Sequence, residues 1–197
     1  MPTPNELLNS RIRDVAGSLP REGGYRWPTT DKTAGGCTVD LMLGKDRVLR
    51  AGRPVGSKGQ PPTYCCGVTL EIFWRGWLRY AKDYGVPFMG GLTLDQARQM
   101  QRAWFCIGTR RGPLDALVPL GLGVEVRAED ARPGDFAQLW RASGSGHSVM
   151  VLGIAGGRIS YFSTQKSTQG IGSTTEPLPD ETYIVRPVVP PARERPL

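Results

Sequence analysis

The stretch "PPTYCCGVTLEIFW", residues 61–74, places two adjacent cysteines between a turn-rich segment and a long apolar run. From Val68 to Leu78 the apolar side chains fall on nearly every side of a helix, which predicts a central helix over about residues 65–83. A thiol in the first turn of such a helix meets backbone N–H groups and the positive end of the helix dipole, and both favour the thiolate. The stretch therefore predicts a nucleophilic cysteine at the start of the helix around which the chain folds.

The rest of the chain divides into helical patterns followed by strand patterns. An amphipathic helix is expected over residues 5–19, and another over residues 93–108 with Thr93 as its N-cap. Short runs rich in Val, Ile, Tyr and Phe then follow, separated by turns, at residues 123–128, 135–142, 147–155, 158–165 and 182–189. This order predicts an α+β fold with an antiparallel sheet arranged as a meander. For "CTVDLML", residues 37–43, strand and helical turn both remain open.

Length and composition favour one domain. The chain has 197 residues, of which 39% are hydrophobic and 22% charged, enough to bury one sizeable core. We expect a single domain over residues 1–190, with a helical and loop extension over 1–60, a core over 61–190 and a disordered tail over 191–197. The apolar runs are too short for a membrane span, and the first residues do not have the pattern of a signal peptide, so neither is expected.

The charge is basic but scattered. A net charge of +7 suits polyanionic surroundings such as nucleic acid, anionic lipid or an acidic cell-wall polymer. The 25 cations form no basic run interleaved with aromatic residues, which is the pattern of a dedicated nucleic-acid surface. We therefore expect no nucleic-acid partner and interpret the charge as a weak steering or solubility effect.

The cysteines do not suggest a disulfide scaffold or a metal site. There are four, and none forms a C-x-x-C pair. A zinc site can be drawn from Cys65, Cys66, Cys106 and His147, but two adjacent side chains do not readily bind the same tetrahedral ion. No metal or other cofactor is expected, and Cys106 is expected to be a small buried residue of the core.

The only histidine lies where it could serve a cysteine nucleophile. His147 opens a predicted strand directly after the flexible "SGSG" segment. The next strand carries Ser163 and Gln165, which alternate onto one face and could both approach the imidazole. A cysteine, a histidine and a polar amide in this order fit cysteine hydrolases, in which the base is oriented by a third group. Taken singly, a cysteine in an apolar run or a lone histidine is more often structural.

Four pieces of the sequence together resemble a known family. They are "CCG" at the start of a helix, "RPGDFAQLW" at residues 132–140, "GHSVMVLGI" at residues 146–154, and a strand that ends in a polar side chain. The combination resembles the NlpC-like and CHAP amidase branch of the papain-like cysteine hydrolases, over about residues 61–166. The resemblance implies a papain-like core and a cysteine amidase or endopeptidase that works through a thioester, with peptidoglycan stem peptides as substrates. Such an enzyme would act in the periplasm or cell wall, and an immunity or inhibitor protein would be a partner if it were a delivered toxin.

Carried over residue by residue, the resemblance assigns the reacting groups. Cys65 becomes the nucleophile, because the motif has the form Cys-x-Gly and Gly67 supplies the glycine. Cys66 then stands at the position of the family's serine, but it stays open as the alternative nucleophile, because only one of two adjacent helix positions can face His147. His147 becomes the general base, which takes the thiol proton and returns it to the leaving amine.

The third member departs from the family. Gln165 matches the third polar residue, and Ser163 stands where the CHAP pattern has an accessory carboxylate, whereas the family has His, Asn or Glu. The "PGD" turn, residues 133–135, also matches, and is explained by a turn in which Asp135 binds its own backbone.

The oxyanion donors are only partly assigned. One would be the backbone N–H of Cys65. The candidates for the second, or for contacts with substrate, are Tyr64, Thr63, Tyr25 and Cys66. In the resembled family a tyrosine upstream of the cysteine often lies near the site. Two other functions remain open on the same fold, a non-catalytic binding module and a non-peptidase acyltransferase.

Overall fold

The computed structural model describes residues 1–21, 24–27, 36–52 and 62–191. The tail predicted over residues 191–197 therefore lies outside the described residues from residue 192 onward. The α-helices are α1 (Pro4–Ser18), α2 (Cys65–Tyr84), α3 (Leu94–Trp104) and α4 (Pro113–Leu117), and the 3-10 helices are η1 (Phe88–Gly90), η2 (Val118–Leu120) and η3 (Ala128–Asp130). The strands are β1 (Leu41–Leu43), β2 (Asp46–Leu49), β3 (Gly123–Val126), β4 (Phe136–Trp140), β5 (Gly146–Ala155), β6 (Arg158–Gln165), β7 (Gly170–Pro177) and β8 (Glu181–Pro187).

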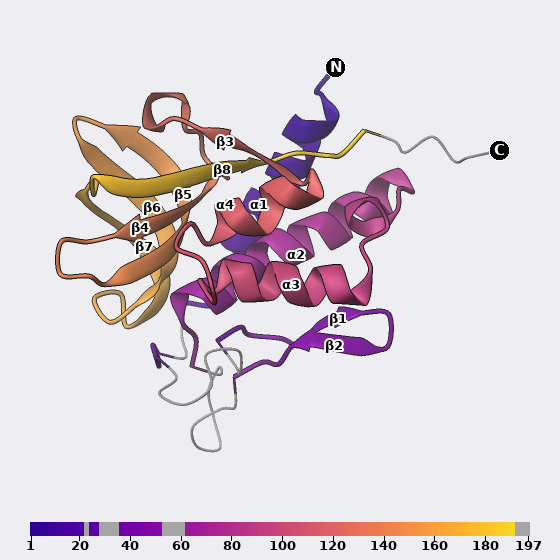
Figure 1. Cartoon of the computed structure of the whole chain (residues 1–197), viewed down its shortest axis with the longest axis horizontal. Coiled ribbons are helices and arrows are strands. Elements are labelled where there is room, and N and C mark those ends of the chain that lie inside the picture. Colours follow the sequence, from indigo (N-terminus) through magenta and orange to yellow (C-terminus); the bar gives the residue numbers. More distant parts are fainter. Residues whose placement is uncertain (22–23, 28–35, 53–61, 192–197) are drawn as a thin grey trace.

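The predicted α+β class is confirmed, since helices pack on an antiparallel sheet (Figure 1). The sheet has six strands in the order β3-β8-β4-β5-β6-β7, and every neighbouring pair is antiparallel. The predicted meander is wrong at one place, because β8 returns between β3 and β4. Strand β4 therefore pairs with β8 on one side and with β5 on the other.

Helix α2 is central, as its apolar sequence predicts. Its buried residues include Phe73, Trp74 and Trp77, each at most 1% exposed. The ring of Phe73 packs against Trp104 of α3 and Phe136 of β4, with ring centroids 5.3 and 6.0 Å apart. One detail of the prediction is wrong, because Leu78 is 44% exposed, so α2 has one side that faces solvent.

Among the strands and α-helices, β2, β7 and α4 were not predicted, and each is short or polar. Strands β1 and β2 form a separate hairpin, which settles the open question at residues 41–43 in favour of a strand. Strand β7, "GIGSTTEP", lacks the alternation of apolar residues because it lies at the edge of the sheet. Helix α4 has only five residues. The helix predicted over residues 93–108 is too long, since α3 ends at Trp104.

The start of α2 is held tightly by the chain that precedes it. The backbone N–H of Tyr64 donates to the carbonyl of Gly36 at 3.3 Å, and the N–H of Thr63 donates to the carbonyl of Gly24 at 3.2 Å. At Gly67 a Cβ atom would lie 2.2 Å from the carbonyl carbon and oxygen of Gly36. Only a glycine at position 67 allows this close approach, which explains the glycine two residues after Cys65.

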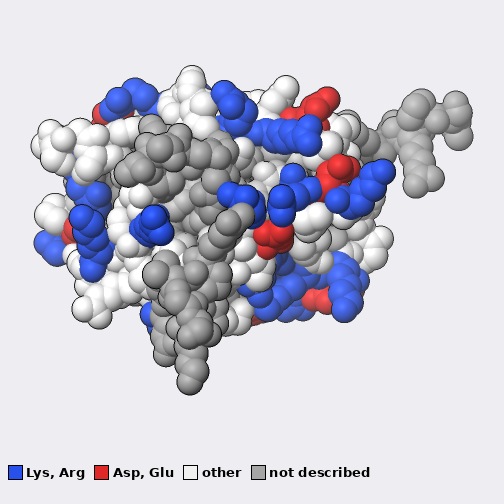
Figure 2. All heavy atoms as spheres, turned by 90° about the horizontal axis from the view of Figure 1, so that it is seen from below, with Lys and Arg blue, Asp and Glu red and all other residues white. Residues whose placement is uncertain are grey.

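Figure 2 shows Lys and Arg side chains at several separate places on one face, with Asp and Glu between some of them. Among the described residues, Arg110 forms an ion pair with Glu181, and Arg47 forms one with Asp40. Within the described ranges, no helix is both long and apolar enough to cross a membrane.

We predict that Gly67→Ala destabilises the protein, because the added methyl group would overlap the backbone of Gly36. Overpacking of this kind costs about 1–3 kcal/mol. Gly17→Ala is the matched control, since Gly17 is also helical and a Cβ there meets nothing within 4 Å. The free energies of unfolding from urea titrations compare the two variants, and equal values for both would contradict the close approach at Gly67.

Candidate active site

Two cysteines occupy the first two positions of α2. Cys65 and Cys66 are 2% and 6% exposed, and their sulfur atoms lie 3.8 Å apart. The N-cap residue, Tyr64, makes no side-chain hydrogen bond to the first turn. The N–H groups of this turn therefore lack the side-chain acceptor that a Ser, Thr, Asp or Asn cap would supply, and they lie at the positive end of a helix of 20 residues.

A hydroxyl pair joins the start of α2 to the strand that carries His147. The hydroxyl of Thr69 donates to the carbonyl of Cys65 at 2.9 Å, one turn back along α2. Its oxygen lies 2.8 Å from the hydroxyl of Ser148 and accepts from Trp104 Nε1 at 3.0 Å. Because Thr69 has one proton and gives it to Cys65, the hydroxyl of Ser148 is the donor in the pair. This buried hydrogen bond fixes the position of the start of α2 against β5.

The surroundings of the two thiols shift their pKa values in opposite directions. The pKa of Cys65 is well below its usual range, first because the Cys66 thiol hydrogen-bonds to it. The imidazole of His147, by hydrogen bonding and by charge, and the backbone of Ser148 lower it further, against the opposing effect of burial. The pKa of Cys66 is well above its usual range, because of the bond to Cys65, burial and the neighbouring charge of Cys65. These opposite shifts favour the thiolate on Cys65, with Cys66 as its hydrogen-bond donor.

His147 is the second residue of β5 and is 5% exposed. Its ring lies edge-on to the ring of Tyr161, with the centroids 5.4 Å apart. Its Nε2 atom is buried and has no hydrogen-bond partner among the described residues. The structure thus brings His147 to Cys65 and leaves one ring nitrogen with its hydrogen-bonding capacity unused.

The two polar residues predicted on the next strand have different surroundings. The last pair of the β5–β6 register is Met150 with Phe162, and His147 and Gln165 lie three residues further along each strand. The amide oxygen of Gln165 accepts from the hydroxyl of Tyr161 at 3.1 Å, and its Nε2 is buried without a partner among the described residues. The hydroxyl of Ser163 instead donates to the carbonyl of Ser148 at 2.7 Å. Ser163 is therefore bound to the backbone of β5, whereas Gln165 has a free amide end.

Of the predicted oxyanion candidates, Tyr25 has the clearest electrostatic link to the cysteines. Burial raises the pKa of its phenol to about 12, and the charges of Cys65 and Cys66 contribute to the rise. Tyr64 has its ring packed edge-on against Trp27 and Phe105, at centroid distances of 5.5 and 5.7 Å.

The third candidate, Thr63, donates its hydroxyl to that of Thr164 at 2.9 Å. This bond ties the segment before α2 to β6. The oxyanion role suggested for Thr63 therefore competes with a structural one.

The prediction for Cys106 as a core residue is wrong. It follows the end of α3 with φ of 55°, a left-handed conformation, and is only partly buried. Burial raises the pKa of its thiol to about 12, and the charge of Cys65 adds to this. The sequence shows this only indirectly, through the glycines at 108 and 112 that break the helical pattern.

Gln138, a buried residue of β4 near the site, was not predicted as a site residue. It is 2% exposed, and its Oε1 has no partner among the described residues. A Cβ at Gly112 would lie 2.9 Å from that oxygen, and one at Gly146 would lie 3.0 Å from the amide nitrogen, so both glycines leave room for this amide. The signal was available, because Gln138 shares a strand face with the apolar Phe136.

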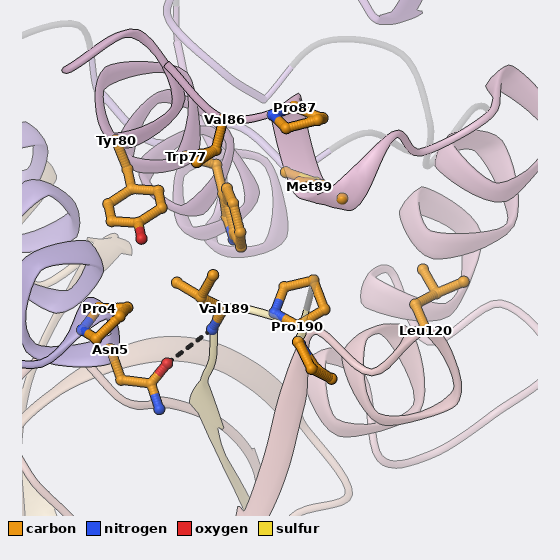
Figure 3. A pocket seen from close by; sticks show the side chains of 12 residues that line it. Pro4, Asn5, Trp77, Tyr80, Val86, Pro87, Met89, Leu120, Val189 and Pro190 are labelled. Carbon is orange, nitrogen blue, oxygen red and sulfur yellow. Dashed lines mark hydrogen bonds between the residues drawn. The ribbon is translucent and has the colours of Figure 1, made fainter. Parts of the chain in front are cut away.

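Two other features lie apart from this cluster. Within the described ranges, no group of three or more His, Cys, Asp or Glu residues could hold a metal ion. A pocket of about 630 Å³ lies between α2 and the segment after β8, where Trp77 and Tyr80 face Val189 and Pro190 (Figure 3). Trp77 comes twelve residues after Cys65, roughly 18 Å along the helix axis. The pocket is therefore at the other end of α2.

No family model matches the chain, and no curated protein matches it either. The function must accordingly be inferred from the chemistry of the site itself.

We predict that Cys66→Ala raises the pKa of Cys65, because the variant lacks the thiol that stabilises the thiolate most. Cys66→Ser is the matched control, since it keeps a hydroxyl donor at the same place. The measurement is the rate of Cys65 alkylation by iodoacetamide from pH 4 to 9, followed by peptide mapping. The midpoint should move to higher pH in Cys66→Ala and move less in Cys66→Ser. An unchanged midpoint in Cys66→Ala would show that Cys66 is not the donor.

Proposed function

We propose that this chain is a cysteine hydrolase with a papain-like core that cleaves peptide amide bonds. The observation that carries the proposal is the lowered pKa of Cys65 in the first turn of the central helix, next to the single histidine. A lowered cysteine pKa beside an imidazole is the arrangement of activated thiol nucleophiles. The order of the elements, with this helix before an antiparallel sheet that carries His147, supports the papain-like core.

In the first step the thiolate of Cys65 attacks the carbonyl carbon of the scissile amide. A C–S bond forms, and the electron pair of the C=O double bond moves to the oxygen. When this intermediate collapses, the C–N bond breaks and the imidazolium of His147 gives its proton to the leaving amine. The products of this step are a free amine and a thioester on Cys65.

The oxyanion of this step would be bound by two donors. One is the backbone N–H of Cys65 in the first turn of α2, and the other is the hydroxyl of Tyr25. Because burial raises the pKa of Tyr25 to about 12, the phenol stays protonated at neutral pH and can donate. A preorganised donor of this kind contributes about 10²–10³ in rate.

In the second step water hydrolyses the thioester. His147, now neutral, takes a proton from the water as the oxygen attacks the acyl carbon. The C–S bond then breaks, the acid is released, and Cys65 leaves as the thiolate paired with the imidazolium. Proton count and charge return to the starting state.

Peptidoglycan stem peptides are the proposed substrates, and the periplasm or cell wall the proposed place of action. The substrate class follows from the resemblance of residues 61–166 to the NlpC-like and CHAP amidases. The net charge of +7 supports it, since cell-wall polymers are acidic.

We predict that Cys65→Ala and His147→Ala each lose the release of free amines from purified peptidoglycan fragments, by roughly 10³-fold or more because the two groups act as one unit. Tyr84→Phe, an exposed change at the far end of α2, is the control and should keep full activity. Intact mass spectrometry during turnover should detect the acyl group on the wild-type protein and not on Cys65→Ala. If wild type releases no amine and forms no acyl adduct, the binding module replaces the hydrolase; acyl transfer to an added amine in place of hydrolysis would indicate the acyltransferase.

A further inference from the structure

We propose that Tyr161 is a positioning residue for His147. The ring of Tyr161 fixes the orientation of the imidazole, and its hydroxyl holds the amide of Gln165. The inference rests on the proposed function, because it concerns the same Cys65–His147 site. It adds a residue that the sequence pattern did not single out and two charged residues, Arg141 and Glu176, that hold it.

The ring of Tyr161 gives the imidazole a fixed surface. Tyr161 is 1% exposed and belongs to a second apolar cluster, which lines the other side of the sheet from α2 together with Val149, Val151 and Ile159. Its ring meets that of His147 edge-on at a centroid distance of 5.4 Å and an interplanar angle of 67°. Because the tyrosine is packed on its other sides, the imidazole cannot tilt in this direction without disturbing the cluster.

The hydroxyl of Tyr161 is hydrogen-bonded to Arg141 and to Gln165. It donates to Gln165 Oε1 at 3.1 Å and accepts from Arg141 Nη2 at 3.5 Å. Arg141 in turn binds the carboxylate of Glu176 through Nε and Nη2, at 2.9 to 3.1 Å. A forked contact of this type fixes the guanidinium plane. The small side chain of Ser163, between Tyr161 and Gln165 on β6, leaves room for the bond along the strand.

The surroundings of the Tyr161 phenol keep it protonated. Burial, and then the charge of Glu176, raise the pKa of Tyr161 to about 12, while Arg141 and Gln165 lower it less. The hydroxyl therefore keeps its proton over the pH range in which cysteine and histidine titrate. It can donate to the amide oxygen of Gln165 or accept from its amide nitrogen. The amide group can therefore turn over, exchanging its oxygen and nitrogen, and still keep a hydrogen bond to Tyr161.

This freedom matters because two nitrogen atoms remain unused. Nε2 of His147 and Nε2 of Gln165 are both buried and lack partners among the described residues. When His147 is an imidazolium, its Nε2–H needs an acceptor, and the turned amide of Gln165 offers its oxygen. When His147 has given the proton of its other nitrogen to the leaving amine, the neutral imidazole keeps its proton on Nε2, and the same amide oxygen can accept it. Tyr161 keeps the amide opposite the ring in both states.

The test uses the alkylation of Cys65 and the turnover of peptidoglycan fragments in the same set of variants. Tyr161→Phe keeps the ring and removes only the hydroxyl. We expect the midpoint of Cys65 alkylation to move part of the way toward that of His147→Ala. We also expect kcat to fall roughly 10- to 100-fold with little change in KM, since a misplacement of about 1 Å can cost about 10²-fold. Tyr80→Phe is the matched control, because Tyr80 is also a buried tyrosine, 4% exposed, at the other end of α2.

A double-mutant cycle separates positioning from general stability. If the hydroxyl acts through Gln165, adding Tyr161→Phe to Gln165→Ala should lower kcat no further. Glu176→Gln weakens the ion pair that fixes Arg141 and leaves the Tyr161 ring unchanged. It should shift the midpoint of Cys65 alkylation in the same direction as Tyr161→Phe, but less. It serves as the test if Tyr161→Phe does not fold.

Three results would overturn the proposal, and they can be told apart. If the alkylation midpoint of wild type depends on His147 but Tyr161→Phe and Glu176→Gln both match wild type, Tyr161 has no positioning role. The same conclusion follows if the effects of Tyr161→Phe and Gln165→Ala simply add. If wild type and His147→Ala have the same midpoint, the Cys65–His147 site itself fails, and with it the proposed function.

Discussion

The structure depends on how the first turn of α2 meets β5 and the segment around Gly36. The absence of a side chain at Gly67 lets this turn touch the backbone of Gly36, where a Cβ would come within 2.2 Å. One turn further, the hydroxyl pair of Thr69 and Ser148 joins the helix to the sheet at 2.8 Å. Since Ser148 follows His147 directly, this contact also sets where the imidazole lies relative to Cys65. A shift of the helix by even one residue would remove both contacts.

The polar groups around this contact are buried, and burial makes each of them depend on its neighbour. A thiolate inside a protein needs donors, and Cys65 finds them in Cys66, His147 and the backbone of Ser148. The second cysteine of the pair thus has a chemical role as a donor, with its own pKa raised. Among the described residues, Oε1 of Gln138 on β4 and Nε2 of Gln165 on β6 are buried without a hydrogen-bond partner. Unsatisfied buried polar groups are costly, which makes them notable near a candidate site.

Much of the fold could be predicted from local pattern. The apolar run after Cys65 predicts the central helix, and the alternating runs after residue 122 predict five of the six strands of the main sheet. Edge strand β7 and the hairpin β1–β2 could not be found in this way, because short strands with one exposed face carry little apolar alternation. Tyr161 was not recognised because its role depends on a ring contact with His147 and on an ion pair between Arg141, directly after β4, and Glu176 of β7. Such contacts leave no trace in sequence spacing.

The sequence by itself determined the class of fold, the helix that begins at the cysteines, and the pairing of one cysteine motif with a single histidine on a later strand. These follow from hydrophobic period and from residue type, which are local properties. Only the tertiary structure gives the two chemically identical thiols different neighbours, which lower the pKa of Cys65 and raise that of Cys66. It also decided the place of β8 between β3 and β4, and the commitment of Ser163 to the backbone while Gln165 keeps a free amide end. Those features depend on contacts between residues far apart in the chain, where packing geometry and burial set the energies.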